Sequence, residues 1–141
     1  HLQYWLGGGL SGGRRRIDGW LDQVRPQLTE VHVDGRPALV GSEHVDELRA
    51  TATDPTTLLL PGYDQWVVGA GTADESIVPP ALRPAATKGV GLVLVGGRAV
   101  GTWKRSKAGI EVDWAGDGQA PIDALRVAGE RLGAAKVTVA A

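Results

Sequence analysis

Cysteine, methionine and phenylalanine are all absent from the 141 residues of this chain. Without cysteine, the chain can form neither a disulfide nor a thiolate metal site. The spacing of the three histidines, His1, His32 and His44, matches no compact zinc motif, so we expect no metal site and no cofactor. No apolar run approaches the roughly 20 residues that span a bilayer, and no signal-peptide pattern is present. The expected location is therefore the cytoplasm, with no membrane partner.

An excess of charge of either sign is also lacking. The 15 Lys and Arg residues and 16 Asp and Glu residues give a formal net charge of −1. A self-sufficient DNA-binding module is usually basic, so this balance counts mildly against one. The basic residues occur in clusters, however, and their distribution matters more than their sum. The hydrophobic content of 43% is enough to build a core at this length.

The start of the chain has no initiating methionine and no polar leader. The first residue is His1, and the apolar stretch His1-Leu-Gln-Tyr-Trp-Leu6 reads as the end of a helix. This beginning indicates a fragment, and a processed full-length protein is the alternative. We therefore expect a truncated N-terminal unit and, as its partner, a missing N-terminal half of the same protein.

Residues 1–53 have the element order of a winged helix. Apolar residues at helical spacing predict a helix over about 12–24. Two strands follow around Asp34-Gly35, which is a strong tight-turn signal. In this interpretation the helix is the recognition helix and the hairpin is the wing, with Arg36 near its tip. A short helix over about 42–49 and a polar linker at 50–56 complete the unit.

Residues 54–141 have a different sequence pattern, with short predicted strands, turns and glycines. Strands are expected at 57–60, 66–69, 91–95, 99–103 and 110–114. A short helix is expected at 77–82, and a helix at about 120–132 and a strand at 137–139 close the domain. Several short strands with turns between them predict a small β-barrel. The predicted fold class is thus α/β (α+β), a partial winged helix followed by a small β-barrel with a C-terminal helix and strand.

Two basic clusters and the wing supply the candidate DNA-binding residues. The first cluster lies in the first turns of the predicted recognition helix, where its charges oppose the helix dipole and a phosphate would relieve the cost. Helical geometry fans these three arginines over about 200°, so they cannot all face one groove, and a solvated helix face is the alternative. The second cluster lies in a hairpin, where it can follow a phosphate backbone or simply block edge-to-edge pairing. The full set is Arg14, Arg15, Arg16, Arg36, Lys104, Arg105 and Lys107.

No constellation of residues predicts an enzyme site. Asp64 and the Asp74-Glu75 pair fall in loops, and no nucleophile stands beside them. The tryptophans are expected in the core because the chain has no Phe and needs large apolar groups, although two of them flank the basic hairpin and can stack. They are Trp5, Trp20, Trp66, Trp103 and Trp114.

Three blocks of the sequence occur in the order typical of one known family. They are Leu58-Leu-Leu-Pro-Gly-Tyr-Asp64, Ile77-Val-Pro-Pro-Ala-Leu-Arg83 and Val95-Gly-Gly-Arg-Ala-Val-Gly-Thr-Trp-Lys104. With Tyr4-Trp-Leu-Gly7, Arg15-Arg16 and the Val33-Asp-Gly-Arg36 hairpin upstream, they resemble the winged-helix DNA-binding-domain family. This family includes the bacterial DNA glycosylases that unhook interstrand crosslinks and excise alkylated bases. The resemblance covers most of residues 1–115 and implies winged-helix units followed by a β-barrel.

One motif of the glycosylases in this family is missing. Those enzymes carry a catalytic Gln-x-Gln motif in their N-terminal region, so the resemblance implies that catalysis would depend on it. The glutamines of this chain are isolated from one another, at Gln3, Gln23, Gln27, Gln65 and Gln119. No catalytic residue is therefore carried over, and whether the chain belongs to an enzyme stays open.

The leading hypothesis is binding of double-stranded DNA, as the C-terminal portion of a DNA glycosylase-like repair protein. In that case a missing N-terminal half processes a flipped base while this part grips the duplex. A nonenzymatic winged-helix transcriptional regulator is the first alternative, and a palindromic target with a stable dimer would favour it. A protein-interaction module without a nucleic-acid role is the second, and the near-neutral charge allows it.

Overall fold

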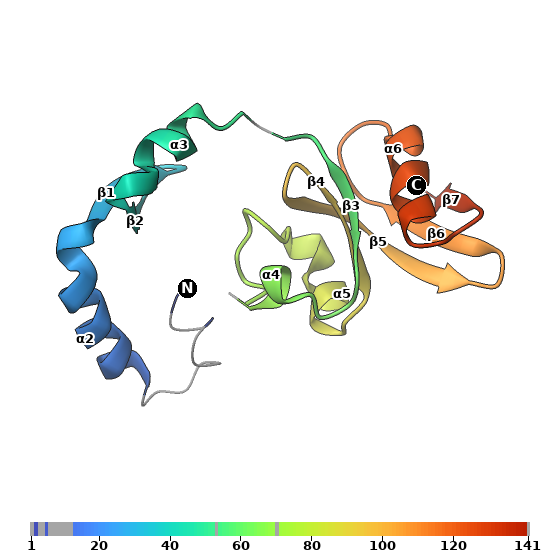
Figure 1. The fold of residues 1–141 in the computed structure, drawn as a ribbon. Helices are drawn as coiled ribbons and strands as arrows, with labels where there is room; N and C mark the ends of the chain where they lie inside the picture. The colour runs from blue at the N-terminus through green and yellow to red at the C-terminus, as the bar shows by residue number, and fades with distance from the viewer. Residues whose placement is uncertain (1, 3–4, 6–12, 53, 70, 141) are drawn as a thin grey trace.

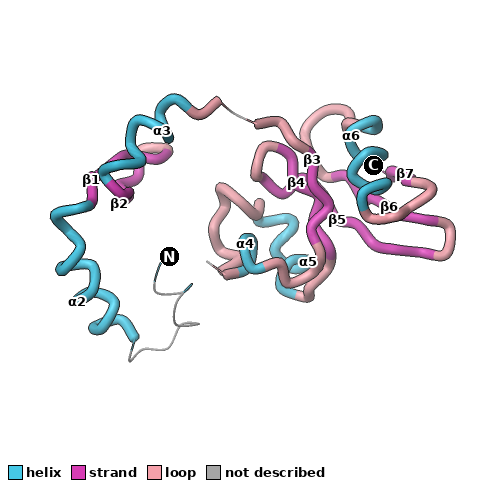
Figure 2. Tube along the Cα trace, in the orientation of Figure 1, coloured by secondary structure: helices cyan, strands magenta, loops and turns pink. Residues whose placement is uncertain are grey.

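The computed structural model describes residues 2, 5, 13–52, 54–69 and 71–140, which form two regions joined by a short connection (Figure 1). The arm (residues 13–50) consists of a helix, a hairpin and a short helical segment. The sheet region (residues 57–140) is a β-sheet with helices packed against it (Figure 2). In this described part of the chain, no helix has the length and apolar character needed to cross a membrane.

The arm has the order of elements that the sequence predicts. Asp34 and Gly35 connect its two strands with φ values of 50° and 75°, the backbone that a two-residue type I′ turn requires. Val33 pairs with Arg36 on either side of this turn, so the strands are antiparallel. The order is confirmed, and the assignment to a winged helix stays a prediction. The elements are α2 (Arg14–Val24), η2 (Arg25–Gln27), β1 (Leu28–Val33), β2 (Arg36–Gly41), η3 (Ser42–His44) and α3 (Val45–Ala50).

The sheet region contains five strands in the order β3-β4-β5-β6-β7. Neighbouring strands are antiparallel except for β6 and β7, which are parallel. A parallel pair needs a crossover connection, and α6 supplies it. These elements are β3 (Thr57–Leu60), β4 (Gly91–Val95), β5 (Arg98–Ser106), β6 (Gly109–Trp114), α6 (Ile122–Arg131) and β7 (Val137–Ala140).

The sheet is open, whereas the sequence predicted a small barrel. Among the strands that the structure describes, β3 and β7 lie at the two edges and do not pair with each other. The helix α6 packs against β3 and contributes Leu125 and Ala128 to the core on that face. A helix can bury the apolar face of a sheet without the sheet closing on itself. The barrel is therefore not confirmed, and the fold is a mixed α+β arrangement.

Between β3 and β4, one local prediction is wrong and another is correct only in its last three residues. Residues 66–69 were expected as a strand, but α4 (Gln65–Val68) is helical. The Asp64 carboxylate begins this helix because its Oδ1 accepts the backbone N–H of Trp66 at 3.0 Å. The helix expected at 77–82 lies further along the chain, as η4 (Pro80–Leu82) followed directly by α5 (Arg83–Thr87).

The core lies on both faces of the sheet, and β4 contributes to each because successive strand residues point to opposite sides. The cluster beneath α6 consists of Leu59, Val93, Ile110, Val112, Leu125, Ala128 and Ala134. The cluster beneath α4 and α5 consists of Val67, Val78, Leu82, Ala86, Leu92, Leu94 and Ala99. In the arm, by contrast, Ile17 is the only buried residue among residues 13–50.

Candidate nucleic-acid interface

The first turn of α2 carries Arg14, Arg15 and Arg16, all exposed, and no acidic residue. The N-cap residue Gly13 has no side chain to accept a hydrogen bond, so the positive end of the helix dipole is not compensated there. Arg14 Nε lies 4.0 Å from Asp18 Oδ2, an exposed ion pair that contributes little. Among the described residues, Arg15 and Arg16 have no ion-pair partner. An anion such as a DNA phosphate would neutralise this turn.

Arg36 is exposed at the start of β2, directly after the tight turn. Its charge is among the causes that lower the pKa of Asp74, a residue of the sheet region. The largest cause is the hydrogen bond that the Ser76 hydroxyl donates to the Asp74 carboxylate. The tip of the hairpin is therefore within electrostatic range of the loop that follows α4.

The second basic cluster, Lys104, Arg105 and Lys107, lies in the hairpin between β5 and β6. Two of these residues have partners within the fold, and one has none among the residues that the structure describes. Lys104 Nζ lies 3.0 Å from Glu111 Oε2, and this hydrogen bond is the main cause that lowers the pKa of Glu111. Arg105 Nη2 donates to the carbonyl oxygen of Leu132 at 2.6 Å and so satisfies the C-terminal end of α6. Lys107 is exposed in the turn and makes no hydrogen bond or ion pair with another described residue. Lys107 is thus the residue of this cluster whose charge is not shared with another described group.

The tryptophans fall into packed and exposed groups. Trp103 and Trp114 pack against the core, and their indole N–H groups donate to Leu60 O at 2.7 Å and Gly118 O at 3.2 Å. The core prediction is confirmed for these two. It is wrong for Trp5, Trp20 and Trp66, whose exposed fractions are 39%, 51% and 79%. Trp66 was missed because its position was expected in a buried strand, whereas the Asp64 cap turns the segment into a helix that presents the ring to solvent.

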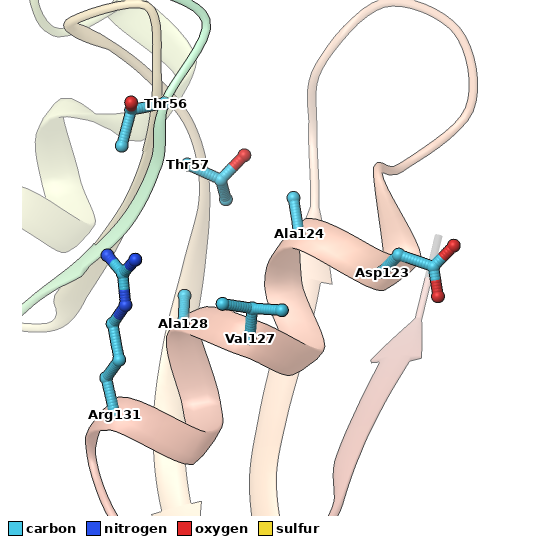
Figure 3. A pocket seen from close by; sticks show the side chains of 7 residues that line it. All are labelled: Thr56, Thr57, Asp123, Ala124, Val127, Ala128 and Arg131. Atoms are coloured by element: carbon cyan, nitrogen blue, oxygen red, sulfur yellow. The ribbon is translucent and has the colours of Figure 1, made fainter.

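A small pocket with a volume of about 300 Å³ lies between the start of β3 and α6 (Figure 3). Figure 3 shows the Thr57 side chain near Ala124, while Arg131 extends toward Thr56 from the last turn of α6. The sequence analysis singled out none of these residues, because β3 and α6 are far apart in the chain. The pocket is lined by Thr56, Thr57, Asp123, Ala124, Val127, Ala128 and Arg131.

Histidines and acidic residues do not assemble into a metal site within the ranges that the structure describes. His44 lies on the surface, 3.7 Å from Glu43 and 3.4 Å from Glu47. His32 is exposed on β1, and His1 lies outside the described residues. The two described histidines therefore lie apart from each other on the arm, His32 on β1 and His44 at the end of η3.

The loop carboxylates have local structural roles. Asp64 caps α4, and Asp74 accepts a hydrogen bond from the backbone N–H of Ser76 at 3.0 Å. Glu75 Oε1 accepts from Arg83 Nη2 at 2.9 Å. These contacts account for all three carboxylates that the sequence analysis considered for acid–base chemistry. The described geometry assigns no catalytic role to them.

An open mixed sheet preceded by an arm with uncompensated arginines defines an α+β protein with a candidate anion-binding surface. The family described as DNA glycosylase AlkZ-like matches residues 1–135, and the chain belongs to this family.

The chain is similar to a glycosylase sequence and to a solved glycosylase structure, both from Streptomyces sahachiroi. An interstrand DNA cross-link repair glycosylase is 39% identical over 98 residues, which are 67% of this chain and 26% of the relative. The solved structure of the DNA glycosylase AlkZ superposes with a TM-score of 0.79 at 31% sequence identity. The superposition covers 89% of this chain and 37% of the AlkZ chain. The chain thus spans between about a quarter and somewhat more than a third of the length of these relatives.

Proposed function

We propose that this chain binds double-stranded DNA as the C-terminal portion of a DNA glycosylase-like repair protein. The observation that carries this proposal is membership of the AlkZ-like family together with the match to a DNA glycosylase structure over 89% of the chain. A bacterial source and a cytoplasmic location go with the proposal, because the relatives are Streptomyces DNA repair proteins.

The proposed contacts follow from the exposed cations of the arm and of the β5–β6 hairpin. The arm acts as the final winged helix, with α2 as recognition helix and the β1–β2 hairpin as wing. Arg15, Arg16, Arg36 and Lys107 bind phosphates, and they can do so without breaking an ion pair of the fold. Arg14 can join them by leaving its weak exposed pair with Asp18. Lys104 and Arg105 contribute less, because each is already engaged within the sheet region.

In this proposal the chemistry belongs to the remainder of the longer protein. Of the three loop carboxylates, Asp64 caps α4, Asp74 accepts a hydrogen bond from Ser76, and Glu75 pairs with Arg83. The chain also has no Gln-x-Gln motif, which the family resemblance makes the expected catalytic element. This portion would therefore contribute affinity and position, while the remaining part of the protein excises the base.

The test is fluorescence anisotropy of a labelled DNA duplex titrated with the chain at several salt concentrations. Each phosphate contact contributes about 0.9 to the slope of log K against log salt concentration. Since the α2 arginines fan around the helix, one or two of them can reach the same backbone. The triple variant Arg14→Ala, Arg15→Ala, Arg16→Ala should therefore lower the slope by about 1 to 2.

A matched triple variant removes the same charge at the far end of the molecule. The changes are Arg126→Ala, Arg131→Ala and Lys136→Ala, on and after α6. We expect this variant to keep the wild-type salt slope, apart from a small uniform loss of affinity. A wild-type chain that is folded yet does not bind at about 50 mM salt would contradict the proposal and favour a protein-interaction module. Equal losses in the two triple variants would contradict the assignment to α2.

A further inference from the structure

Two exposed aromatic side chains lie three residues apart where the chain passes from the loop after β3 into α4. Tyr63 has an exposed fraction of 65%, and Trp66 has an exposed fraction of 79%. Large aromatic side chains are usually covered in folded proteins, since each buries considerable apolar area when it packs. Two such rings three residues apart are therefore a feature that requires an explanation.

The backbone beneath Tyr63 is held in an unusual conformation. Tyr63 has a φ of +58°, in the left-handed region that side-chain-bearing residues seldom adopt. Its ring lies directly against Gly89, where an added Cβ would come within 2.1 Å of Tyr63 Cε2. An added Cβ on Gly62 would come within 1.8 Å of the carbonyl oxygen of Gly89. The exposed ring therefore rests on a close backbone approach that two glycines permit.

Trp66 is also fixed from several sides. Asp64 Oδ1 accepts its backbone N–H at 3.0 Å, and Val67 beside it is only 2% exposed and anchors α4 in the core. The Trp66 ring lies 5.4 Å from that of Trp5, centroid to centroid, with an interplanar angle of 57°. Even with this neighbour, most of the Trp66 side chain remains accessible.

One exposed cation lies beside the glycine that the Tyr63 ring contacts, and a second acts on the adjoining loop. Lys88 directly precedes Gly89, against which Tyr63 packs, and it is exposed without an ion pair among the described side chains. Thr87 joins the neighbouring loop through a hydrogen bond of 3.3 Å to Thr72. Arg36 acts electrostatically on that same loop at Asp74. Figure 1 shows α4 on the side of the sheet region that faces the arm, which carries the proposed phosphate contacts.

We propose that Tyr63 and Trp66 form a stacking platform for an unpaired DNA base, with Lys88 holding the adjoining phosphate. This inference rests on the proposed DNA-binding function and names the residues that would distinguish a distorted site from a regular duplex. Rigid aromatic faces beside positive charge suit stacking on a base, because every base has a π-face and is flanked by phosphates. Bases at mismatched or damaged sites cost least to unstack, so the platform favours such sites.

The test compares two labelled duplexes of the same sequence, one fully paired and one with a single bulged 2-aminopurine. We expect Trp66→Ala to weaken binding of the bulged duplex about tenfold and that of the paired duplex less than about twofold. Tyr63→Ala should act in the same direction. Trp66→Phe and Tyr63→Phe should retain most of the preference, because they keep an aromatic face. Wild-type protein should quench the 2-aminopurine fluorescence, and Trp66→Ala should relieve that quenching.

A matched control removes exposed apolar area elsewhere. Ile122→Ala lies on α6, where the side chain is 56% exposed, and should leave the binding of both duplexes unchanged. Wild-type binding with no preference for the bulge, or equal losses on both duplexes in Trp66→Ala, would overturn the platform and leave the DNA-binding function standing. No binding to either duplex would overturn both. Self-association lost in Trp66→Ala, with DNA binding unchanged, would identify the rings as a contact between copies and also overturn the platform.

Discussion

The arm and the sheet region differ in what holds each of them together. The sheet region buries apolar side chains on both faces of its sheet, whereas the arm buries Ile17 alone among residues 13–50. A single two-stranded hairpin and a helix of 11 residues are each marginal in water without packing. The sheet region can therefore maintain its own fold, and the arm needs contact with another surface to hold one conformation. Such an arm is suited to becoming ordered when a partner binds to it.

The largest expected effect is loss of a core side chain from the sheet region. Leu125 is fully buried beneath the sheet, so Leu125→Ala should lower the free energy of unfolding by about 2 to 5 kcal/mol. The comparable change in the arm, Leu48→Ala, removes a side chain that is 56% exposed and should cost less than about 0.5 kcal/mol. Urea denaturation followed by tryptophan fluorescence measures both. Similar losses for the two variants would show that the arm belongs to the same cooperative core.

Glycine-to-alanine substitutions should have opposite effects in the two regions, destabilising the sheet region and stabilising the arm. Gly62→Ala places a Cβ within 1.8 Å of the Gly89 carbonyl oxygen, so we expect a loss of about 1 to 3 kcal/mol. Gly19→Ala in α2 meets nothing within 4 Å and should favour the helix by up to about 1 kcal/mol. Thermal unfolding measures the first change, and helicity by far-UV circular dichroism measures the second. A Gly62→Ala variant as stable as the wild type would contradict the close approach of these loops.

Arg105 and Lys107 of the β5–β6 hairpin should then behave differently, because only Arg105 has a partner among the described residues of the fold. Arg105→Ala removes the donor to the Leu132 carbonyl at the end of α6 and should cost about 1 kcal/mol of stability. Lys107→Ala removes no contact and should leave stability unchanged, while it weakens DNA binding at low salt. Parallel urea denaturation and anisotropy titrations measure both properties. If Lys107→Ala alone were destabilising, the partners assigned to this hairpin would be wrong.

The smallest expected effect is a change in one titration. Ser76→Ala removes the hydroxyl that is the main cause lowering the pKa of Asp74, so that pKa should rise toward its ordinary value. Because the folded-state pKa is lowered, this interaction stabilises the fold above the unfolded pKa of about 3.9 and is lost as pH falls through the folded pKa. NMR titration of the Asp74 carboxyl carbon measures the shift, with Thr56→Ala as a control that should affect Asp54 and leave Asp74 unchanged. An unchanged Asp74 titration in Ser76→Ala would contradict this cause.

Elements set by local chemistry could be predicted from the sequence. Asp34-Gly35 dictates its own turn, and the apolar spacing of α6 and alternation in β6 predict a helix and a strand. The segment Trp66-Val-Val-Gly69 was misread because its β-branched residues favour a strand, while a single cap at Asp64 decides for a helix. Closure of the sheet could not be predicted, because it depends on where α6 packs.

The residues of the candidate site could be predicted only where helical or turn position by itself indicates that a side chain is exposed. The α2 arginines occupy the exposed first turn that helical spacing indicates. The partner of Arg105 is a carbonyl 27 residues away, and Trp103 donates to a carbonyl 43 residues away, so no local pattern could indicate either contact. The exposure of Tyr63 and Trp66 was also not predicted, because aromatic residues are normally assigned to the core.

Amide hydrogen exchange of the chain, with and without a DNA duplex at low salt, tests the central claim most directly. Without DNA, we expect slow exchange in β4, β5 and β6 and fast exchange in α2 and the β1–β2 hairpin. With DNA, protection should increase in α2, in the hairpin and in the segment from Tyr63 to Trp66, and the protected strands should change little. Equal protection of the arm and the sheet region without DNA, with no change when DNA is added, would contradict the account.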